Sequence, residues 1–370
     1  MYTLRREHET LNHSPTDIEQ NVDAISAIDA AVELIHAAGG TVEQKAVPQF
    51  EDRDWTAEGV LDYEVGRYAR NVAEHYHDIL RSRHIGALKD AMAKGHPNFA
   101  TQEGPTILRH GAVAVVGAGP SLDKNAEHLR DFPGIIIACD RAAMVLTARG
   151  ITPDLVVCVD PRPEVMADFL RYPENRDQKL VLSVLCDPEV ARVWKGEKFY
   201  MSTLHPGTQF FDRVLPSLFP GMPATFACGN VGNSGLQIAE WIGAEKVVLV
   251  GQDYGYADGK MACDPWVRFP NGTWQRAAWS AEDCAAKLAQ RTGKVTVDGV
   301  ETYGQFLSYR ETLMEMVKSW ELDVVNATEG GLLKDLPCAP LQDVVRSLRD
   351  EKYSAEESHA LLAKATGGLP

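Results

Sequence analysis

Four aspartates each come directly after an apolar run of the sequence. They are Asp140 after IIIAC, Asp160 after LVVCV, Asp187 after LVLSVLC and Asp253 after VVLVGQ. Short apolar runs that alternate with helix-like segments are typical of strands buried on both faces of a parallel sheet. The carboxyl ends of parallel strands lie along one edge, where α/β proteins bind their ligands. We therefore expect these carboxylates to share one edge of a sheet.

Each aspartate could instead cap the helix that follows it, because aspartate is a favoured N-cap residue. Capping is the favoured role for Asp187, which precedes a proline at the first helical position. Asp140 lies about 20 residues after a glycine turn, a spacing that suits a ribose contact. Asp160 enters a stiff Pro-Arg-Pro loop, and Asp253 stands among amide and phenol groups in GQDYGY. A functional role is therefore favoured for the last two.

The stretch AVAVVGAGPSLDK, residues 112–124, carries a glycine turn formed by Gly117, Ala118, Gly119, Pro120 and Ser121. It lacks the third glycine of a dinucleotide fingerprint, since Leu122 stands there, and the chain contains no Walker loop. Free amides at the start of the following helix would favour an anion such as a nucleotide phosphate. The alternative is a plain turn between a strand and a helix.

The order of the elements predicts an α/β fold with a doubly wound, mostly parallel, Rossmann-like sheet. The predicted strands lie in the apolar runs 112–119, 135–140, 155–160, 179–187, 198–203 and 245–253. Helices are predicted at 124–130, 141–149, 164–170, 210–218, 233–242, 280–290 and 305–321. We divide the chain into a helical N-terminal region (1–104), a Rossmann-like catalytic domain (105–335) and a helical C-terminal tail (336–370).

Composition narrows the class of partner. The chain of 370 residues carries 37 Lys and Arg against 52 Asp and Glu, a formal charge of −15. Such a surface repels phosphate backbones, so we expect no nucleic-acid partner. The charged start of the chain does not resemble a signal peptide, and no apolar run approaches the ~20 residues of a membrane span. The seven cysteines form no CxxC pair, so we expect a cytoplasmic protein with reduced thiols and no zinc site.

Four segments in a fixed order are similar to those of a known group of enzymes. They are GAGPSLDKN, ITPDLVVCVDP, GNVGNSGLQIAEWIGAEKVVLVGQDYGYADGK and VVNATEGG. In this order they resemble the motility-associated factor (Maf) glycosyltransferases, which are associated with flagellin glycosylation. The MptE-like 6-hydroxymethylpterin diphosphokinases belong to the same domain family. The central part also resembles the bacterial sialyltransferases that use CMP-activated sugars.

The resemblance implies a set of nucleotide- and donor-binding residues. It assigns the turn residues Gly117, Gly119, Pro120 and Ser121 to the nucleotide, with Asp140 and Asp160 beside it. Asn230, Asn233 and Ser234 lie in GNVGNSG, a second small-residue turn that opens a helix and could bind an anion. Gln252 and Asp253 would face the donor sugar. Asn326, Thr328 and Glu329 of NATEGG would close the cleft, although an ordinary turn explains that segment equally well.

Glycosyl transfer to an alcohol needs a base and a group that stabilises the leaving phosphate. His205 follows a predicted strand at the same edge and is the candidate base, with Asp253 in reserve and Asp160 as a further catalytic carboxylate. A loop histidine without a role remains the alternative. Arg162, held between two prolines, is favoured over Lys124 and Arg141 for the phosphate. Asp140, Asp160 or Asp253 could also hold Mg²⁺, and whether a metal is needed stays open.

Three functions remain open from the sequence. The first is transfer of a nonulosonic, sialic-acid-like sugar from a CMP donor to a Ser or Thr hydroxyl of a flagellin-like protein acceptor. The second is diphosphoryl transfer from ATP, with Mg²⁺, to 6-hydroxymethyl-7,8-dihydropterin. The third is a non-catalytic module that binds a nucleotide sugar. The helical additions at both ends favour the first, because a small pterin substrate would not call for them.

Overall fold

A computed structural model describes the α/β part of the chain. The described residues are 111–160, 178–204 without 185 and 187, 224–226, 230–269, 271–277, 280, 282, 284, 294–351 and 353–365. The predicted N-terminal region and the predicted helices at 164–170 and 210–218 lie outside them, as does most of the one at 280–290. The boundaries 1–104, 105–335 and 336–370 stay predictions.

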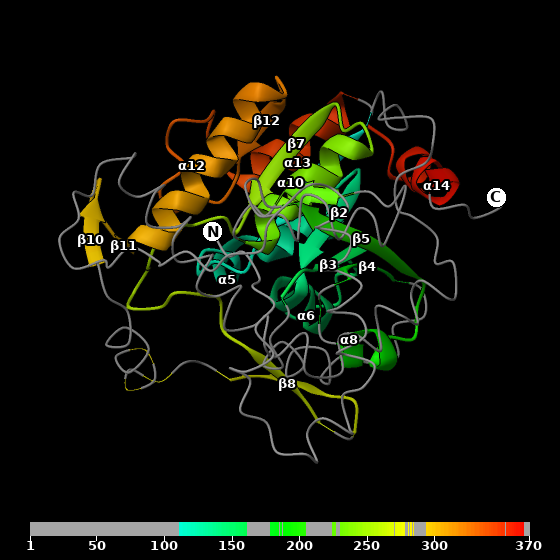
Figure 1. Ribbon diagram of the computed structural model, residues 1–370, viewed down its shortest axis with the longest axis horizontal. Coiled ribbons are helices and arrows are strands. Elements are labelled where there is room, and N and C mark those ends of the chain that lie inside the picture. Colours follow the sequence, from blue (N-terminus) through cyan, green and yellow to red (C-terminus); the bar gives the residue numbers. More distant parts are fainter. Residues whose placement is uncertain are drawn as a thin grey trace, which may run out of the picture.

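The centre of the molecule is an eight-stranded parallel sheet with the order β12-β7-β1-β2-β3-β4-β5-β6 (Figure 1). Its strands are β1 (Ala112–Val116), β2 (Ile135–Cys139), β3 (Leu155–Cys158), β4 (Lys179–Ser183), β5 (Lys198–Leu204), β6 (Ala224–Phe226), β7 (Lys246–Val250) and β12 (Asp323–Asn326). Every neighbouring pair runs parallel. The doubly wound Rossmann-like fold is therefore confirmed.

The strand order places the ligand-binding edge. From β1 the chain moves outward through β2 to β6, and then returns to β7 on the other side of β1. The order therefore reverses between β1 and β7. In open α/β sheets the crevice beyond the carboxyl ends of the strands at such a reversal is where ligands bind.

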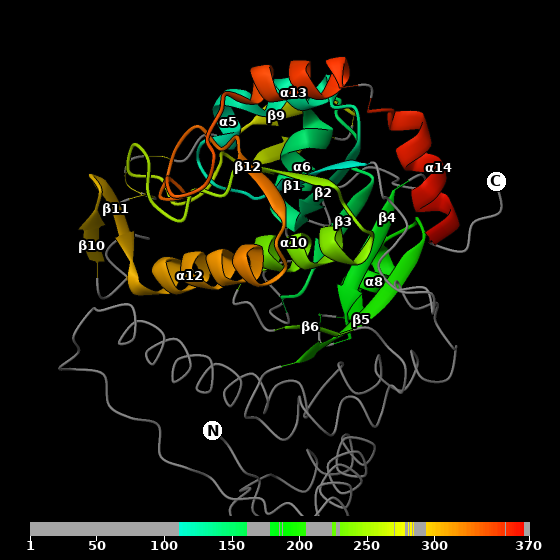
Figure 2. The same ribbon diagram turned by 90° about the horizontal axis from the view of Figure 1, so that it is seen from above.

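Helices cover both faces of the sheet (Figure 2). On one face lie α5 (Leu122–Asn125), the 3-10 turn η1 (Ala126–Asp131), α6 (Asp140–Ala148), α8 (Pro188–Val193) and α13 (Leu341–Asp350). On the other lie α10 (Val231–Trp241), α12 (Gly304–Ser319) and α14 (Ala355–Ala365). Alternate residues of β1 supply the two cores: Ala114 and Val116 pack in the first, and Val113 and Val115 in the second. Burial on both faces is why the strands read as continuous apolar runs.

The six strands predicted from apolar runs are all present, but several other elements differ from the prediction. The short strands β6 and β12 were not predicted as members of the sheet. The predicted helix 124–130 divides into α5 and η1, and the C-terminal tail forms two helices, α13 and α14.

Two antiparallel hairpins lie in a region that the sequence analysis left without strands. The first joins β8 (Trp266–Arg268) to β9 (Trp274–Arg276), and the second joins β10 (Lys294–Val297) to β11 (Val300–Tyr303). The turn of the second contains Asp298 and Gly299, both at positive φ. Such an Asp-Gly turn is the usual two-residue hairpin connection.

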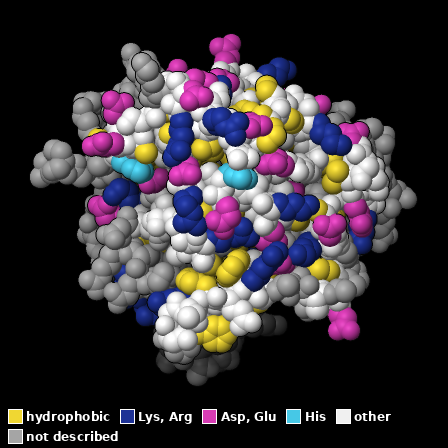
Figure 3. All heavy atoms as spheres, turned by 180° about the vertical axis from the view of Figure 1, so that it is seen from behind, with side chains coloured by type: hydrophobic (Ala, Val, Ile, Leu, Met, Phe, Trp, Pro, Cys, Tyr) yellow, Lys and Arg dark blue, Asp and Glu magenta, His cyan; other side chains and the backbone are white. Residues whose placement is uncertain are grey.

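In the part of the chain that the structure describes, no helix combines the length and apolar character needed to cross a bilayer. On the face seen in Figure 3, Lys and Arg side chains are intermixed with Asp and Glu, and hydrophobic side chains gather in small groups.

Candidate functional site

The glycine turn after β1 packs directly against the loop after β7. The amide of Gly117 donates to the carbonyl of Val250 at 2.8 Å, and that of Gly119 donates to the carbonyl of Gly251 at 2.8 Å. A Cβ atom added at Gly119 would lie 1.8 Å from Oδ2 of Asp253, and one added at Gly117 would lie 2.9 Å from the amide carbon of Gln252. The two glycines are therefore needed for close packing of these loops.

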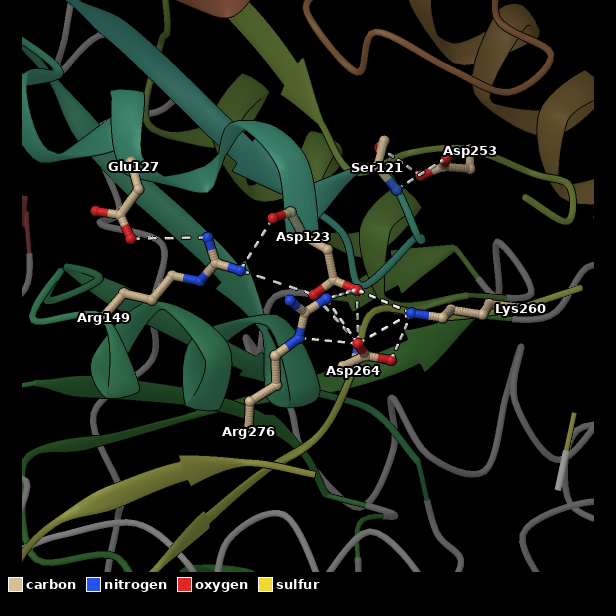
Figure 4. Close-up of polar contacts among 8 residues, drawn as sticks. All are labelled: Ser121, Asp123, Glu127, Arg149, Asp253, Lys260, Asp264 and Arg276. Atoms are coloured by element: carbon tan, nitrogen blue, oxygen red, sulfur yellow. Dashed lines mark hydrogen bonds and ion pairs between the residues drawn. The ribbon is translucent and has the colours of Figure 1, made fainter. Parts of the chain in front are cut away.

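Asp253 joins the two loops through Ser121 (Figure 4). The hydroxyl of Ser121 donates to Oδ2 of Asp253 at 2.7 Å, and its amide donates to Oδ1 at 3.2 Å. The amides of Leu122, Asp123 and Lys124 donate to carbonyls within the turn itself. The expectation of free amides at this helix start is therefore wrong, because the turn and the β7 loop already use them.

Burial dominates the ionisation of Asp253, which is only 3% exposed. Loss of solvent raises the pKa of this carboxyl from its usual 3.8 to about 6, although the bonds from Ser121 and the charge of Lys124 act to lower it. A carboxyl that titrates near neutral pH can act as a proton acceptor. The catalytic role of Asp253 stays a prediction, and the structure gives this side chain a fixed position between the turns.

The NATEGG segment after β12 completes a three-loop junction with the turns after β1 and β7. Nδ2 of Asn125 donates to the carbonyls of Ala327 at 3.0 Å and Thr328 at 3.3 Å, and to Oε1 of Glu329 at 3.1 Å. The amide of Gln252 donates to the hydroxyl of Thr328 at 3.2 Å. The amide of Leu332 donates to the carbonyl of Asp253 at 2.9 Å. The junction therefore joins α5, the β7 loop and the β12 loop.

Asn326 and Glu329 stabilise this junction internally. The side chain of Asn326 donates to the carbonyl of Leu333 and accepts from the amide of Thr328. Glu329, at a φ of 59°, also accepts the amide of Leu341 at the start of α13. The contacts of the segment are those of a turn that fixes neighbouring loops, and a role in closing a ligand cleft stays a prediction.

Asp140 and Asp160 lie at the carboxyl ends of β2 and β3, on the same edge as Asp253. Asp140 is the first residue of α6 and accepts the amide of Arg141 at 2.7 Å. The pKa of the buried Cys158 thiol is raised, mainly by its hydrogen bond with Cys186. The carboxylates of Asp140 and Asp160 add to this rise. The two acids therefore lie near one thiol, and both are half-buried. The predicted shared edge is present.

The N-terminus of α10 lies against the β7 loop. Its N-cap, Asn230, accepts the amide of Asn233 through its side chain at 2.8 Å and the amide of Ser234 through its carbonyl at 3.4 Å. Helix geometry leaves the first amides of a helix without intrahelical partners. After the bonds to Asn230, those of Val231 and Gly232 are the ones that the helix does not satisfy.

Gln252 places a side-chain donor at the same point. Its carboxamide is pressed between Gly117 and Gly232, since a Cβ added at Gly232 would lie 2.6 Å from its Nε2 atom. The residue is 4% exposed, and among the described residues no acceptor meets Nε2. Buried amide groups are normally hydrogen-bonded, so this donor is open to a further group such as a water molecule or a ligand.

Asn233, which was predicted to bind the donor, connects three parts of the fold through its side chain. Its Nδ2 atom donates to the carbonyl of Tyr309 at 2.9 Å, and its Oδ1 atom accepts from the hydroxyl of Tyr254 at 2.7 Å. The side chain is fully buried and holds α10, α12 and the β7 loop together. Ser234 is also buried, in the first turn of α10.

A cluster of charges beside the glycine turn was missed by the sequence analysis (Figure 4). The buried carboxylates of Asp123 and Asp264 share two cations: Arg276 contacts them at 3.2 and 2.6 Å, and Lys260 at 3.8 and 2.8 Å. The amide of Asp264 donates to both oxygens of Asp123. The cluster fixes the segment that follows the β7 loop onto α5. Its members come from separate polar segments, and no pattern in the sequence relates them.

Other predicted groups lie outside the described residues: His205, Arg162 and Asp187. Within those residues, no group of three or more His, Cys, Asp or Glu side chains is arranged to hold a metal ion. Both oxygens of Asp253 accept from Ser121. Asp140, Asp160 and Asp253 remain the candidates for Mg²⁺, and its involvement stays a prediction.

We predict that Gly119→Ala destabilises the protein by roughly 1–3 kcal/mol, because the new methyl group overlaps the Asp253 carboxylate and forces the loops apart. Chemical denaturation measures the change. Gly330→Ala is the matched control, since its added Cβ would lie 3.3 Å from the same carboxylate. Equal stability losses in the two variants would show that the loops do not depend on close packing at Gly119.

We predict that the pH dependence of stability changes in Asp253→Asn. A carboxyl whose pKa is raised in the folded state favours folding while it is protonated, and this contribution is lost as the pH rises from about 4 to about 6. A change from 3.8 to about 6 corresponds to a free energy on the order of 3 kcal/mol. Asparagine can keep both contacts with Ser121 and carries no charge, so the variant should lose less stability than the wild type across this interval.

Urea unfolding at several pH values across this interval measures the difference between the two proteins. Asp258→Asn removes an exposed carboxyl of the same loop and should retain the wild-type slope. If Asp253→Asn also retains it, Asp253 does not titrate in this interval.

Comparison with known proteins gives one family and two informative relatives. Residues 90–259 match the family described as 6-hydroxymethylpterin diphosphokinase MptE-like. The 6-hydroxymethyl-7,8-dihydropterin pyrophosphokinase of Pyrococcus furiosus is 27% identical over 209 residues, which are 56% of this chain and 84% of the relative. The Maf glycosyltransferase structure from Magnetospirillum magneticum is 20% identical with a TM-score of 0.52.

The Maf match covers 76% of this chain but only 41% of the Maf chain, so it shows a common fold. The sialyltransferase CST-II, whose structure was solved with CMP, has a TM-score of 0.35 and 13% identity. That likeness is too slight to bear on function. The predicted resemblance to the MptE-like and Maf group is confirmed by the family model, which matches residues 90–259, and by the first two relatives.

Proposed function

We propose that the chain is a transferase that binds a nucleotide-activated substrate at the edge between β1 and β7. The observation that carries the proposal is the buried Nε2 donor of Gln252, which meets no acceptor among the described residues. It lies beside Gly232, at the N-terminus of an 11-residue helix. The positive end of a helix dipole and its free amides favour a phosphate group.

Two carboxylates of the edge suit the remainder of a nucleotide. Asp140 and Asp160 lie on the β2 and β3 side of the reversal, where carboxylate oxygens can accept hydrogen bonds from ribose hydroxyls. Repulsion keeps the negative phosphate away from them and toward the amides of α10. In the proposed complex the nucleoside therefore extends from α10 across the end of β1 toward Asp140.

The reaction that we favour is transfer of a nonulosonic sugar from a CMP donor to a Ser or Thr hydroxyl of a protein. His205 would take the proton from the acceptor, with Asp253 as the other candidate base. Arg162 would stabilise the departing phosphate. The helical segments outside the Rossmann-like sheet, α12 to α14 among them, favour a large acceptor over a small one.

Diphosphoryl transfer to a pterin is the second candidate. It is supported by the identity of 27% to a pyrophosphokinase over 84% of that enzyme's length. This reaction uses ATP with Mg²⁺, which neutralises the charge of the phosphates when bound. Asp140 and Asp160 would hold the metal ion, since both lie at the same edge of the sheet.

A ligand screen by thermal shift distinguishes these candidates. CMP and CMP-sialic acid, each with and without Mg²⁺, should raise the melting temperature more than ATP, GTP or NAD. Mass spectrometry of the products then follows. A mass increase of hydroxymethyldihydropterin that requires ATP would establish the second candidate. Binding of CMP-sialic acid without transfer to any protein acceptor would indicate a nucleotide-sugar-binding module.

We predict that Gln252→Glu weakens the binding of CMP by roughly tenfold or more, because a carboxylate replaces the donor that faces the phosphate. Isothermal titration measures the dissociation constant, and circular dichroism checks the fold. Gln342→Glu, on the exposed side of α13, makes the same chemical change elsewhere and should leave the constant unchanged. If CMP binds equally to all three proteins, the phosphate does not lie at Gln252.

A further inference from the structure

The hairpin of β8 and β9 forms an arm that projects from the side of the Rossmann-like unit (Figure 1). Its base is fixed by the charge cluster, since Nε of Arg276 donates to Asp264 at 2.8 Å and Nη2 contacts Asp123 at 3.2 Å. On the facing strand, Trp266 lies beneath the guanidinium of Arg149, 5.8 Å from its ring centre. The base is therefore rigid, and the far half makes no comparable contact with the described residues.

The register of the hairpin shows which backbone groups point outward. The amide of Ala277 donates to the carbonyl of Pro265 at 2.9 Å, and the amide of Phe269 donates to the carbonyl of Thr273 at 2.8 Å. In an antiparallel pair, bonded and non-bonded positions alternate. The N–H and C=O groups of the intervening residues therefore face the outer edges, and these residues are Trp266, Arg268, Trp274 and Arg276. The two strands form a sheet of their own, so neither edge is paired with another described strand.

The far half of the arm combines an aromatic surface with a free positive charge. Arg268 lies directly opposite Trp274 and has no ion-pair partner among the described residues, in contrast to Arg276. Phe269 is 42% exposed and is the one exposed large hydrophobic side chain in the described part of the chain. Residues 265–277 contain no acid, whereas the whole chain has a net charge of −15. The arm is thus a basic surface on an acidic protein.

We propose that this arm binds an extended, acidic segment of a partner polypeptide, which adds to an outer edge of the hairpin. An open sheet edge supplies main-chain hydrogen bonds to an added strand, and neighbouring side chains give specificity. Acidic side chains of the partner would pair with Arg268, and an apolar one would cover Phe269. The further idea that this partner is the acceptor rests on the proposed transfer to protein. Binding of an acidic segment by the arm does not depend on that transfer.

The edge geometry and the charge favour a polypeptide over other occupants. A strand added along the outer edge of β8 satisfies the outward N–H and C=O groups of Trp266 and Arg268 in a regular ladder. The opposite charges of the acidic segment and the arm accelerate their encounter and select against basic partners. A neutral glycan would use the aromatic rings and would leave Arg268 unpaired.

Fluorescence anisotropy with the full chain tests the proposal. The probe is a labelled synthetic peptide that alternates Glu and Thr, and its control has Gln in place of Glu. We expect the Glu peptide to bind at least roughly tenfold more tightly at low salt, and added salt to weaken it. Failure of the wild-type protein to bind the Glu peptide, or equal affinity for both peptides, would overturn the proposal.

Variants then locate the binding surface. Arg268→Glu should weaken binding of the Glu peptide by roughly tenfold, and Phe269→Ser by a smaller factor. Arg346→Glu reverses a charge at an exposed position of α13 and should change the affinity by less than about twofold. Equal losses in Arg268→Glu and Arg346→Glu would show that only net charge matters, which contradicts a specific arm.

Two further measurements separate this result from the proposed function. CMP should bind Arg268→Glu as it binds the wild type, since Arg268 makes no described hydrogen bond or ion pair with the loops of the proposed site, and the melting temperatures should agree. Absence of CMP binding in the wild type would count against the proposed function and would leave the peptide result intact. If an acidic oligosaccharide displaces the peptide and binds more tightly, the arm recognises a glycan and the polypeptide assignment is wrong.

Discussion

The buried carboxylate of Asp253 is the group on which the arrangement of loops at the carboxyl edge of the sheet depends. It accepts two hydrogen bonds from Ser121, and its own carbonyl accepts the amide of Leu332 from the β12 loop. Burial of a charge is costly unless hydrogen bonds compensate for it, and the raised pKa of Asp253 records that cost. The three loops that follow β1, β7 and β12 hold one another in place because each contributes to this small polar junction. Glycines at 117, 119, 330 and 331 allow the backbones to approach it.

This constraint changes how the glycine turn should be interpreted. In dinucleotide-binding folds the glycines bring backbone amides close to a pyrophosphate. Here the amides of Gly117 and Gly119 already donate to the β7 loop, and the space above them is filled by Gln252 and Asp253. The turn therefore serves as a platform that positions the neighbouring side chains. In the proposed complex the anion lies instead at the start of α10, beside the Gln252 donor.

The sequence was sufficient to predict what depends on local pattern. The apolar runs identified the central strands, and their carboxyl-terminal acids correctly predicted the shared edge of Asp140, Asp160 and Asp253. The short strands β6 and β12 were missed because each contains only two apolar residues, ATF and DVVN, and so gives little signal. The partnership of Ser121 with Asp253 spans 132 positions, and the salt bridges of Asp123 with Lys260 and Arg276 cross comparable distances. Such contacts depend on the order of the strands in the sheet, and this order cannot be predicted from the pattern of a single sequence.

Charge divides the edge into two halves with different chemistry. The chain is strongly acidic, yet the proposed ligand carries a phosphate, so its binding must rely on oriented dipoles and a few local groups. The Gln252 amide follows β7 and lies against the N-terminus of α10, whereas the carboxylates of Asp140 and Asp160 follow β2 and β3. An anion is attracted to the first half and repelled by the second, whereas a ribose with its hydroxyl donors prefers the reverse. In the proposed complex this asymmetry gives a nucleotide one favoured direction across the edge, with the bond to its activated group at the β7 side, next to the three-loop junction.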